Sequence, residues 1–184
     1  MIGANPILLA EPPGFQSSFG NAVSGDGSVI VGTAMTSSGI GQGFRWTAAG
    51  GMVLIPLLPG DTGGSAWDVN ADGNKITGTS GNGAAFLWSS GTLTNIGAPI
   101  SNELAHGRAI SGDGNTVAGT ASSSGVWTWS SGTPHVVATA LSGLGVDLGG
   151  WVLSDVVDVS ANGKVLVGVG FHNGNDEGWI AILP

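Results

Sequence analysis

A short turn motif recurs four times along this chain, and it limits the possible folds more than any other feature. Each copy places Asp-Gly or Asn-Gly in a turn, continues with a short β-prone run and ends that run with a glycine. Asp-Gly and Asn-Gly favour hairpin turns because both residue types tolerate positive φ angles. The copies begin at Ser24, Asn70, Ser111 and Ser160, roughly 41 to 49 residues apart, which is a period typical of repeat architectures.

Each repeat divides into four short strands, and the repeats span about 22–65, 66–107, 108–154, and 155–184 together with 1–21. The last repeat is one strand short, whereas Pro6–Leu9 resembles the fourth strand of the first repeat. A closed ring leaves no sheet edges exposed. We therefore predict a single all-β domain over 1–184, a β-propeller of four blades of four antiparallel strands that is closed by the N-terminal strand.

Composition restricts the class of protein. Glycine accounts for 35 of 184 residues and charged residues for 9%, so we expect many tight turns and almost no helix. The net charge of −8 and the few, dispersed basic residues argue against nucleic acid as a partner. No apolar run is long enough to span a membrane, and the opening residues lack the features of a signal peptide.

The repeats resemble the bacterial HAF-repeat family. The matching segments are Gly43–Thr47, Gly50–Met52, Leu58–Asp61 and Val23–Gly32, and the resemblance extends over essentially the whole chain. The fourth repeat departs from the family pattern, because Glu177–Ile180 replaces the Phe-Arg-Trp run. The resemblance implies an extracellular or surface-exposed β-repeat protein of propeller type, and it supplies no catalytic residues.

One tryptophan per repeat is predicted on the third strand: Trp46, Trp88, Trp129 and Trp179. These side chains could form a ladder on which sugars stack. We favour packing between blades, because one large aromatic side chain per repeat fills the space between adjacent sheets.

Asp68 and Asp158 occupy the same position, four residues before the turn Asp or Asn of their repeats. In a four-bladed ring they would lie on opposite blades, where two carboxylates near the axis could hold calcium, another ion or water. Solvent exposure is the alternative. The turns themselves lack the oxygen ligands of a calcium loop, so turn chemistry explains their Asp and Asn residues. We predict no other cofactor.

The residues offer little for catalysis. The three histidines lack the spacing of a metal site, tyrosine is absent, and the arginines are limited to Arg45 and Arg108. Propeller glycoside hydrolases need paired carboxylates at a set separation. We therefore predict that the protein is not an enzyme, and a glycoside hydrolase is the weakest alternative.

The longer connections are all predicted at one rim of the propeller, where recognition is usual. This rim holds aromatic, acidic and histidine side chains that suit protein or sugar contacts, and the 140–155 loop is expected to be the most involved. The predicted binding residues are Phe15, Phe19, Glu103, His106, Asp147, Trp151, His172 and Asp176.

These observations predict a non-catalytic structural or binding module on a virion or bacterial surface. It would mediate protein–protein assembly or attachment, with a protein or a surface glycan as its partner and assembly into a larger complex as one outcome. A glycan-binding module of a secreted repeat protein is the alternative. Fold alone does not decide between these functions.

Overall fold

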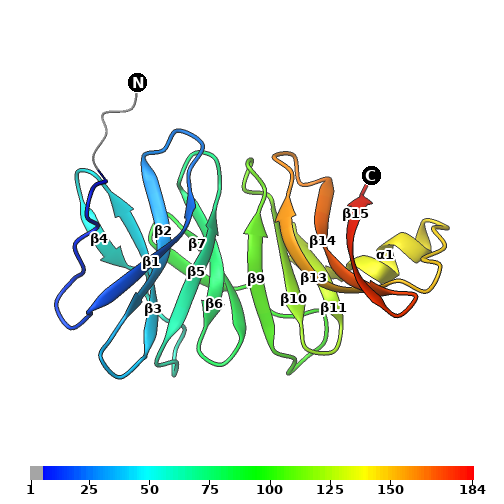
Figure 1. The fold of residues 1–184 in the computed structure, drawn as a ribbon, viewed down its shortest axis with the longest axis horizontal. Coiled ribbons are helices and arrows are strands. Elements are labelled where there is room, and N and C mark those ends of the chain that lie inside the picture. Colours follow the sequence, from blue (N-terminus) through cyan, green and yellow to red (C-terminus); the bar gives the residue numbers. More distant parts are fainter. Residues whose placement is uncertain (1–5) are drawn as a thin grey trace.

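The computed structural model describes residues 6–184, which form four antiparallel sheets standing in a row (Figure 1). In each sheet the strands follow the order of the chain. Sheet 1 contains β1 (Ser17–Val23), β2 (Val29–Met35), β3 (Gly41–Thr47) and β4 (Gly51–Leu54). Sheet 2 contains β5 (Gly64–Val69), β6 (Lys75–Ser80), β7 (Ala84–Ser89) and β8 (Thr92–Asn95).

Sheet 3 contains β9 (Ala105–Ile110), β10 (Thr116–Ala121), β11 (Gly125–Ser130) and β12 (Thr133–Val136). Sheet 4 has three strands, β13 (Val152–Val159), β14 (Val165–His172) and β15 (Asn175–Ile182). The predicted all-β chain with repeated antiparallel sheets is confirmed. The described part of the chain has one helix, α1 (Val137–Gly143), which occupies part of the predicted 140–155 loop. No helix in the described residues is both long and apolar enough to cross a membrane.

The recurring turns are held by their own side chains. In sheet 1 the Ser24 hydroxyl donates to Asp26 Oδ1 at 2.8 Å, and Asp26 Oδ1 also accepts the Ser28 N–H at 2.9 Å. Gly27 follows with a φ of 74°. Ser111 and Asp113 repeat the arrangement in sheet 3, as predicted from turn chemistry.

Backbone hydrogen bonds link these turns across the sheets. Gly25 N–H donates to Ala71 O at 2.9 Å, Ala71 N–H to Gly112 O at 3.0 Å, and Asp113 N–H to Ala161 O at 2.9 Å. The turn of each sheet is therefore tied to the turn of the next. This explains why the motif recurs at the same place in all four repeats.

A glycine on the second strand of each sheet lies opposite an aromatic residue on the third. The pairs are Gly32–Phe44, Gly78–Phe86, Gly119–Trp127 and Gly168–Trp179. A Cβ atom at any of these glycines would overlap the paired ring and a backbone carbonyl of the first strand. The predicted tryptophan set is thus wrong in register, because Trp179 aligns with Trp127, whereas Ala181 takes the position of Trp46, Trp88 and Trp129.

The core consists of three layers, one between each pair of neighbouring sheets. Val31 and Ile76 are fully buried between sheets 1 and 2, Trp127 between sheets 2 and 3, and Leu166 between sheets 3 and 4. Each sheet therefore packs against the sheet that follows it in sequence. Burial of these apolar side chains holds the row together.

The predicted ring closure is wrong for the single chain. Residues 6–9 lie beside sheet 1, at the opposite end of the row from sheet 4 (Figure 1). Ile7 and Leu8 are 77% and 81% exposed, and β15 has β14 as its one strand partner among the described residues. Four sheets packed one after another leave the first and last far apart, so the N-terminal segment cannot reach β15.

Candidate binding site

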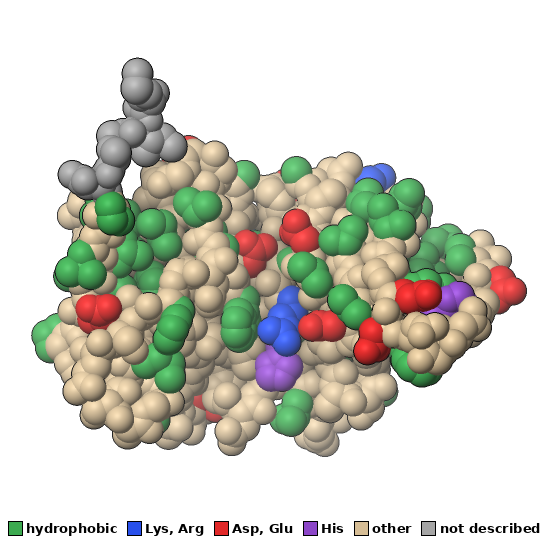
Figure 2. Space-filling model, in the orientation of Figure 1, with side chains coloured by type: hydrophobic (Ala, Val, Ile, Leu, Met, Phe, Trp, Pro, Cys, Tyr) green, Lys and Arg blue, Asp and Glu red, His purple; other side chains and the backbone are tan. Residues whose placement is uncertain are grey.

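The first strands of the four sheets, β1, β5, β9 and β13, run side by side along one face of the row (Figure 1). Asn21, Trp67 and Arg108 each lie three residues before the turn motif of their sheet, so they form one line across these strands. His106 and Asp155 each lie five residues before the motif and form the neighbouring line. Figure 2 shows a histidine, basic side chains and acidic side chains together over the middle of this face. This face therefore concentrates hydrogen-bonding groups in an otherwise weakly charged molecule.

A cleft of about 450 Å³ opens beside this line, between sheets 1 and 2. Such a volume is typical of ligand-sized sites. The cleft is formed by the end of β2, the start of β3, the link from β4 to β5, β5 itself, the end of β6 with the turn after it, and β9. Its lining residues are Thr33, Met35, Ile40, Gly41, Gly60, Asp61, Thr62, Gly63, Gly64, Ser65, Trp67, Thr79, Gly81, Asn82 and His106.

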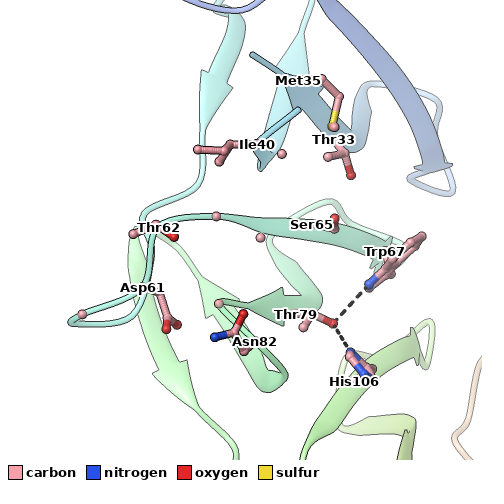
Figure 3. A pocket seen from close by; sticks show the side chains of 15 residues that line it. Thr33, Met35, Ile40, Asp61, Thr62, Ser65, Trp67, Thr79, Asn82 and His106 are labelled. Atoms are coloured by element: carbon pink, nitrogen blue, oxygen red, sulfur yellow. Dashed lines mark hydrogen bonds between the residues drawn. The ribbon is translucent and has the colours of Figure 1, made fainter. Parts of the chain in front are cut away.

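Thr79 connects two of the larger side chains in the cleft (Figure 3). Its Oγ1 accepts the indole N–H of Trp67 at 3.2 Å and lies 3.1 Å from His106 Nδ1. Because the indole can only donate, the Thr79 hydroxyl proton is free to be given to Nδ1. That arrangement leaves the proton of a neutral His106 ring on Nε2.

Arg108 extends this network toward sheet 4. Its guanidinium carbon lies 5.2 Å from the centre of the Trp67 ring, a cation–π distance, and its Nε lies 3.8 Å from Asp155 Oδ1. Asp155 also accepts the Thr120 hydroxyl. Partial burial, with the charge of Arg108 acting in the same direction, lowers the pKa of His106, which favours the neutral ring.

The wall opposite His106 is fixed by Asp61. The carboxylate accepts the Ser80 hydroxyl at 2.7 Å, and Ser80 Oγ in turn accepts the Leu58 N–H at 3.0 Å. Gly81 has a φ of 57°, and a Cβ atom there would overlap the Asp61 carboxylate. The cleft is therefore shaped by hydrogen bonds within the protein.

Of the predicted binding residues, His106 lies in this cleft, on β9 and not on a loop. Phe19 lies on β1 at the position aligned with His106 and is exposed. Phe15 precedes β1, where its N–H donates to Pro12 O. The two phenylalanines thus belong to the same end of the row as the cleft but do not line it.

The remaining predicted residues divide between two other places. Trp151 and His172 stack with ring centres 4.5 Å apart, and His172 Nδ1 lies 3.0 Å from Glu177 Oε2. Asp176 lies on β15, and Asp147 accepts the Gly149 N–H in the segment after α1. Glu103 accepts the N–H groups of Ser123 and Ser124, so it orders the turn between β10 and β11. The predicted rim is therefore not one continuous site.

Asp68 and Asp158 differ in their surroundings. Asp68 accepts the Ile110 N–H of sheet 3 at 2.7 Å and the Val69 N–H at 2.8 Å. Burial raises its pKa to about 6, and the charge of Asp158 adds to the rise. Asp158 is exposed, and the described residues hold no cluster of three or more potential metal ligands. The shared ion stays a prediction, and Asp68 has a role in joining two sheets.

Sequence reasoning missed Trp67, Thr79 and Asp61. Trp67 lies three residues before Asn70, at the position that Asn21 and Arg108 occupy in their repeats. A polar or amphipathic side chain at this position in three repeats is a pattern from which Trp67 could be predicted as part of a binding surface. Thr79 contributes through its contact with His106 of sheet 3, and Asp61 through its contact with Ser80 at the end of β6; spacing alone reveals neither contact.

No protein-family model matches the sequence, and a search of curated proteins finds no match. Solved structures do match. TolB from Acinetobacter baumannii is similar to 91% of this chain, with a TM-score of 0.57 and 17% sequence identity, and the match spans 41% of the TolB chain. This likeness shows that the all-β arrangement of packed antiparallel sheets is shared with part of the TolB structure, and this chain covers less than half of that structure.

Proposed function

We propose that this chain is a non-catalytic, β-propeller-type module that binds a segment of a partner protein in the cleft between sheets 1 and 2. The observation that carries the proposal is the composition of the cleft. Five of its 15 lining residues are glycine, so much of the lining is main chain, the kind of surface on which an extended peptide can lie. Trp67 and His106 supply amphipathic surface beside them.

Charge supports the same function. Asp61 is the one carboxylate among the lining residues, and Ser80 already engages it, so the cleft lacks the two carboxylates that glycoside hydrolysis needs. The fold likeness to TolB is compatible with a protein-binding role. We further propose that the chain belongs to the HAF-repeat type and acts on a bacterial or virion surface.

A second candidate ligand is a glycan. Thr33, Thr62, Thr79 and Asn82 give the cleft several hydroxyl and amide groups, which suit a hydroxylated ligand. Trp67 is a weaker stacking platform than it would be alone, because Arg108 already lies over its ring. This occupied ring is why we rank the glycan second.

The test uses a displayed library of random peptides and, in parallel, a glycan array. Thr62→Trp places a large side chain on an exposed lining residue, and Thr92→Trp makes the same change at an exposed site on β8, away from the cleft. We expect peptides that bind the unmodified chain and the Thr92→Trp variant but bind Thr62→Trp at least 10-fold more weakly. Glycan binding with this pattern would favour the second candidate, whereas binding unaffected by Thr62→Trp would exclude the cleft.

A further inference from the structure

We propose that this chain associates head to tail with a second copy of itself, with sheet 4 of one copy packing against sheet 1 of the other. In the same contact, residues 6–9 of the second copy add the fourth strand to β13–β15. The proposal depends on the incompletely covered faces at the two ends of the row and is independent of the cleft.

The outer face of sheet 4 is strongly apolar and uncovered. Val167 and Val169 on β14 are 39% and 43% exposed, and Ile180 and Ile182 on β15 are 66% and 69% exposed. Val167 pairs with Ile180 across the strands, so these side chains form one continuous patch. Large apolar patches of this kind mark interaction surfaces.

The same face in the other sheets is covered by the next sheet. Val31 of sheet 1, Thr77 of sheet 2 and Ala118 of sheet 3 align with Val167, and all three are fully buried. Sheet 2 thus carries a threonine at a covered position, whereas sheet 4 carries a valine at an open one. The open face is more apolar than a covered one, which points to a partner that buries it.

Sheet 1 has the complementary face, and it is covered only in part: Phe44 on this face is fully buried, but the face has no preceding sheet. Val23 is 58% exposed, whereas the aligned Val69, Ile110 and Val159 are 6%, 4% and 6% exposed because a preceding sheet covers them. Beside it a cavity of about 820 Å³ lies between Ile7 and Leu9 on one side and Ile30 and Trp46 on the other. A preceding sheet would fill this space.

The edge strand of sheet 4, β15, can accept residues 6–9 as a fourth strand. In sheets 1 and 2, the residue after the fourth strand donates its N–H to the third strand: Ile55 to Gly43 O and Ile96 to Ala85 O. Gly178 of β15 is the aligned acceptor. An apolar hollow of about 430 Å³ runs along this edge, lined by Leu148, Trp151, Trp179 and Ala181 among others.

These features identify the occupant as a second copy. The three internal interfaces already join a face like that of sheet 4 to a face like that of sheet 1, so the two end faces fit each other by the same packing. In each internal interface the link before the first strand follows the fourth strand of the preceding sheet. Residues 6–9 precede β1 in the same way and carry exposed Ile7 and Leu8. A head-to-tail contact closes a ring or extends a chain of copies, depending on its rotation.

The test is sedimentation velocity of the 184-residue chain over a range of concentrations. We expect species whose masses are multiples of 18.1 kDa and grow with concentration. The double variant Ile180→Lys/Ile182→Lys should remain monomeric, as should Val23→Lys, with unchanged circular dichroism. Val53→Lys is the matched control, because Val53 is 60% exposed on β4, outside both faces, and it should associate normally.

Mixing the two monomeric variants separates head-to-tail contact from other pairings. Each variant keeps one intact face, so the mixture should form a heterodimer and no larger species. Leu8→Asp should weaken association at least 10-fold if residues 6–9 join β15. A strictly monomeric unmodified chain, or self-association that persists in Val23→Lys, would overturn the proposal.

Discussion

Sheets 2 and 4 share one sequence pattern, yet one is covered on both faces and the other on one. In sheet 2 the inner position Thr77 is fully buried, and its hydroxyl donates to Phe86 O at 3.0 Å. In sheet 4 the aligned Val167 is exposed, and its side chain has no polar group that requires a hydrogen-bond partner. A covered face can therefore include a polar side chain if its hydrogen bond is made within the sheet. Conversely, an apolar residue at a repeat position does not by itself mean burial.

The largest effect should come from the aromatic residues that lie over the second-strand glycines. Trp127 is fully buried and has Val136 beside it on the fourth strand, so Trp127→Ala should cost about 3–5 kcal/mol of unfolding free energy. Trp179 is 8% exposed and lacks a fourth strand among the described residues, so Trp179→Ala should cost less, roughly 2–3 kcal/mol. Urea unfolding of the monomer, followed by circular dichroism, measures both. Equal losses would show that the missing strand does not weaken sheet 4.

The next effect concerns Asp68 and Asp158, which occupy the same position in sheets 2 and 4. The pKa of Asp68 is raised in the folded state to about 6, so the unfolded state loses its proton first as pH rises. The free energy of unfolding should therefore fall between about pH 4 and 6, by at most about 3 kcal/mol from this residue. Asp68→Asn should remove that fall, whereas Asp158→Asn should leave it largely in place. Thermal unfolding at several pH values gives the comparison.

Other groups with shifted pKa values must be separated from this effect, and hydrogen bonds lower the pKa values of Glu103 and Asp113 as well as that of Asp26. The pKa of Asp26 is lowered to about 2 by its turn hydrogen bonds, so its contribution is lost only below pH 4. The pKa of His106 is lowered mainly by burial, so its contribution to stability rises with pH below its ordinary value and opposes that of Asp68. A His106→Gln background therefore isolates Asp68. A flat profile in that background would contradict the assigned shift.

The turns, the repeat number and the all-β class could be predicted from sequence because they depend on local chemistry. Ser24, Asp26 and Gly27 fix one hairpin without help from distant residues. Ring closure could not be predicted in this way, since a strand-like segment such as Pro6–Leu9 is the same in sequence whether or not it reaches β15. The cleft could not be predicted from the sequence for a similar reason. His106 is a predicted binding residue, but its partner Thr79 comes from another sheet, and contacts of that kind depend on how the sheets pack.

A smaller effect should follow from exchanging the residue types of Thr77 in sheet 2 and Val167 in sheet 4. Thr77→Val keeps the shape of the buried side chain but removes its hydrogen bond to Phe86 O, at a cost of about 0.5–1.5 kcal/mol. Val167→Thr changes an exposed side chain and should alter the stability of the monomer by less than about 0.5 kcal/mol. Urea unfolding at low protein concentration measures both. If Val167→Thr proved as costly as Thr77→Val, the outer face of sheet 4 would be covered within the monomer.

The smallest effect concerns the turn of sheet 4, which has Asn162 where sheet 3 has Asp113. Asn162 Oδ1 accepts the Ser160 hydroxyl at 2.8 Å and the Lys164 N–H at 3.2 Å, whereas Asp113 Oδ1 accepts Ser111 and Asn115 at 2.6 and 3.0 Å. The pKa of Asp113 is lowered by these hydrogen bonds, the bond from Ser111 first. Asn162→Asp should therefore add a charged acceptor and stabilise the chain by a few tenths of a kcal/mol, about the limit for an exposed site.

Because the folded pKa of the new carboxyl would be depressed, the gain should exist at pH 7 and disappear as pH falls through about 4 to 3. Paired thermal unfolding of the variant and the parent at pH 7 and pH 3 tests this, with Asn162→Ala as the control that removes the acceptor. A gain that persisted at pH 3 would mean that the carboxylate does not replace Asn162 in the turn.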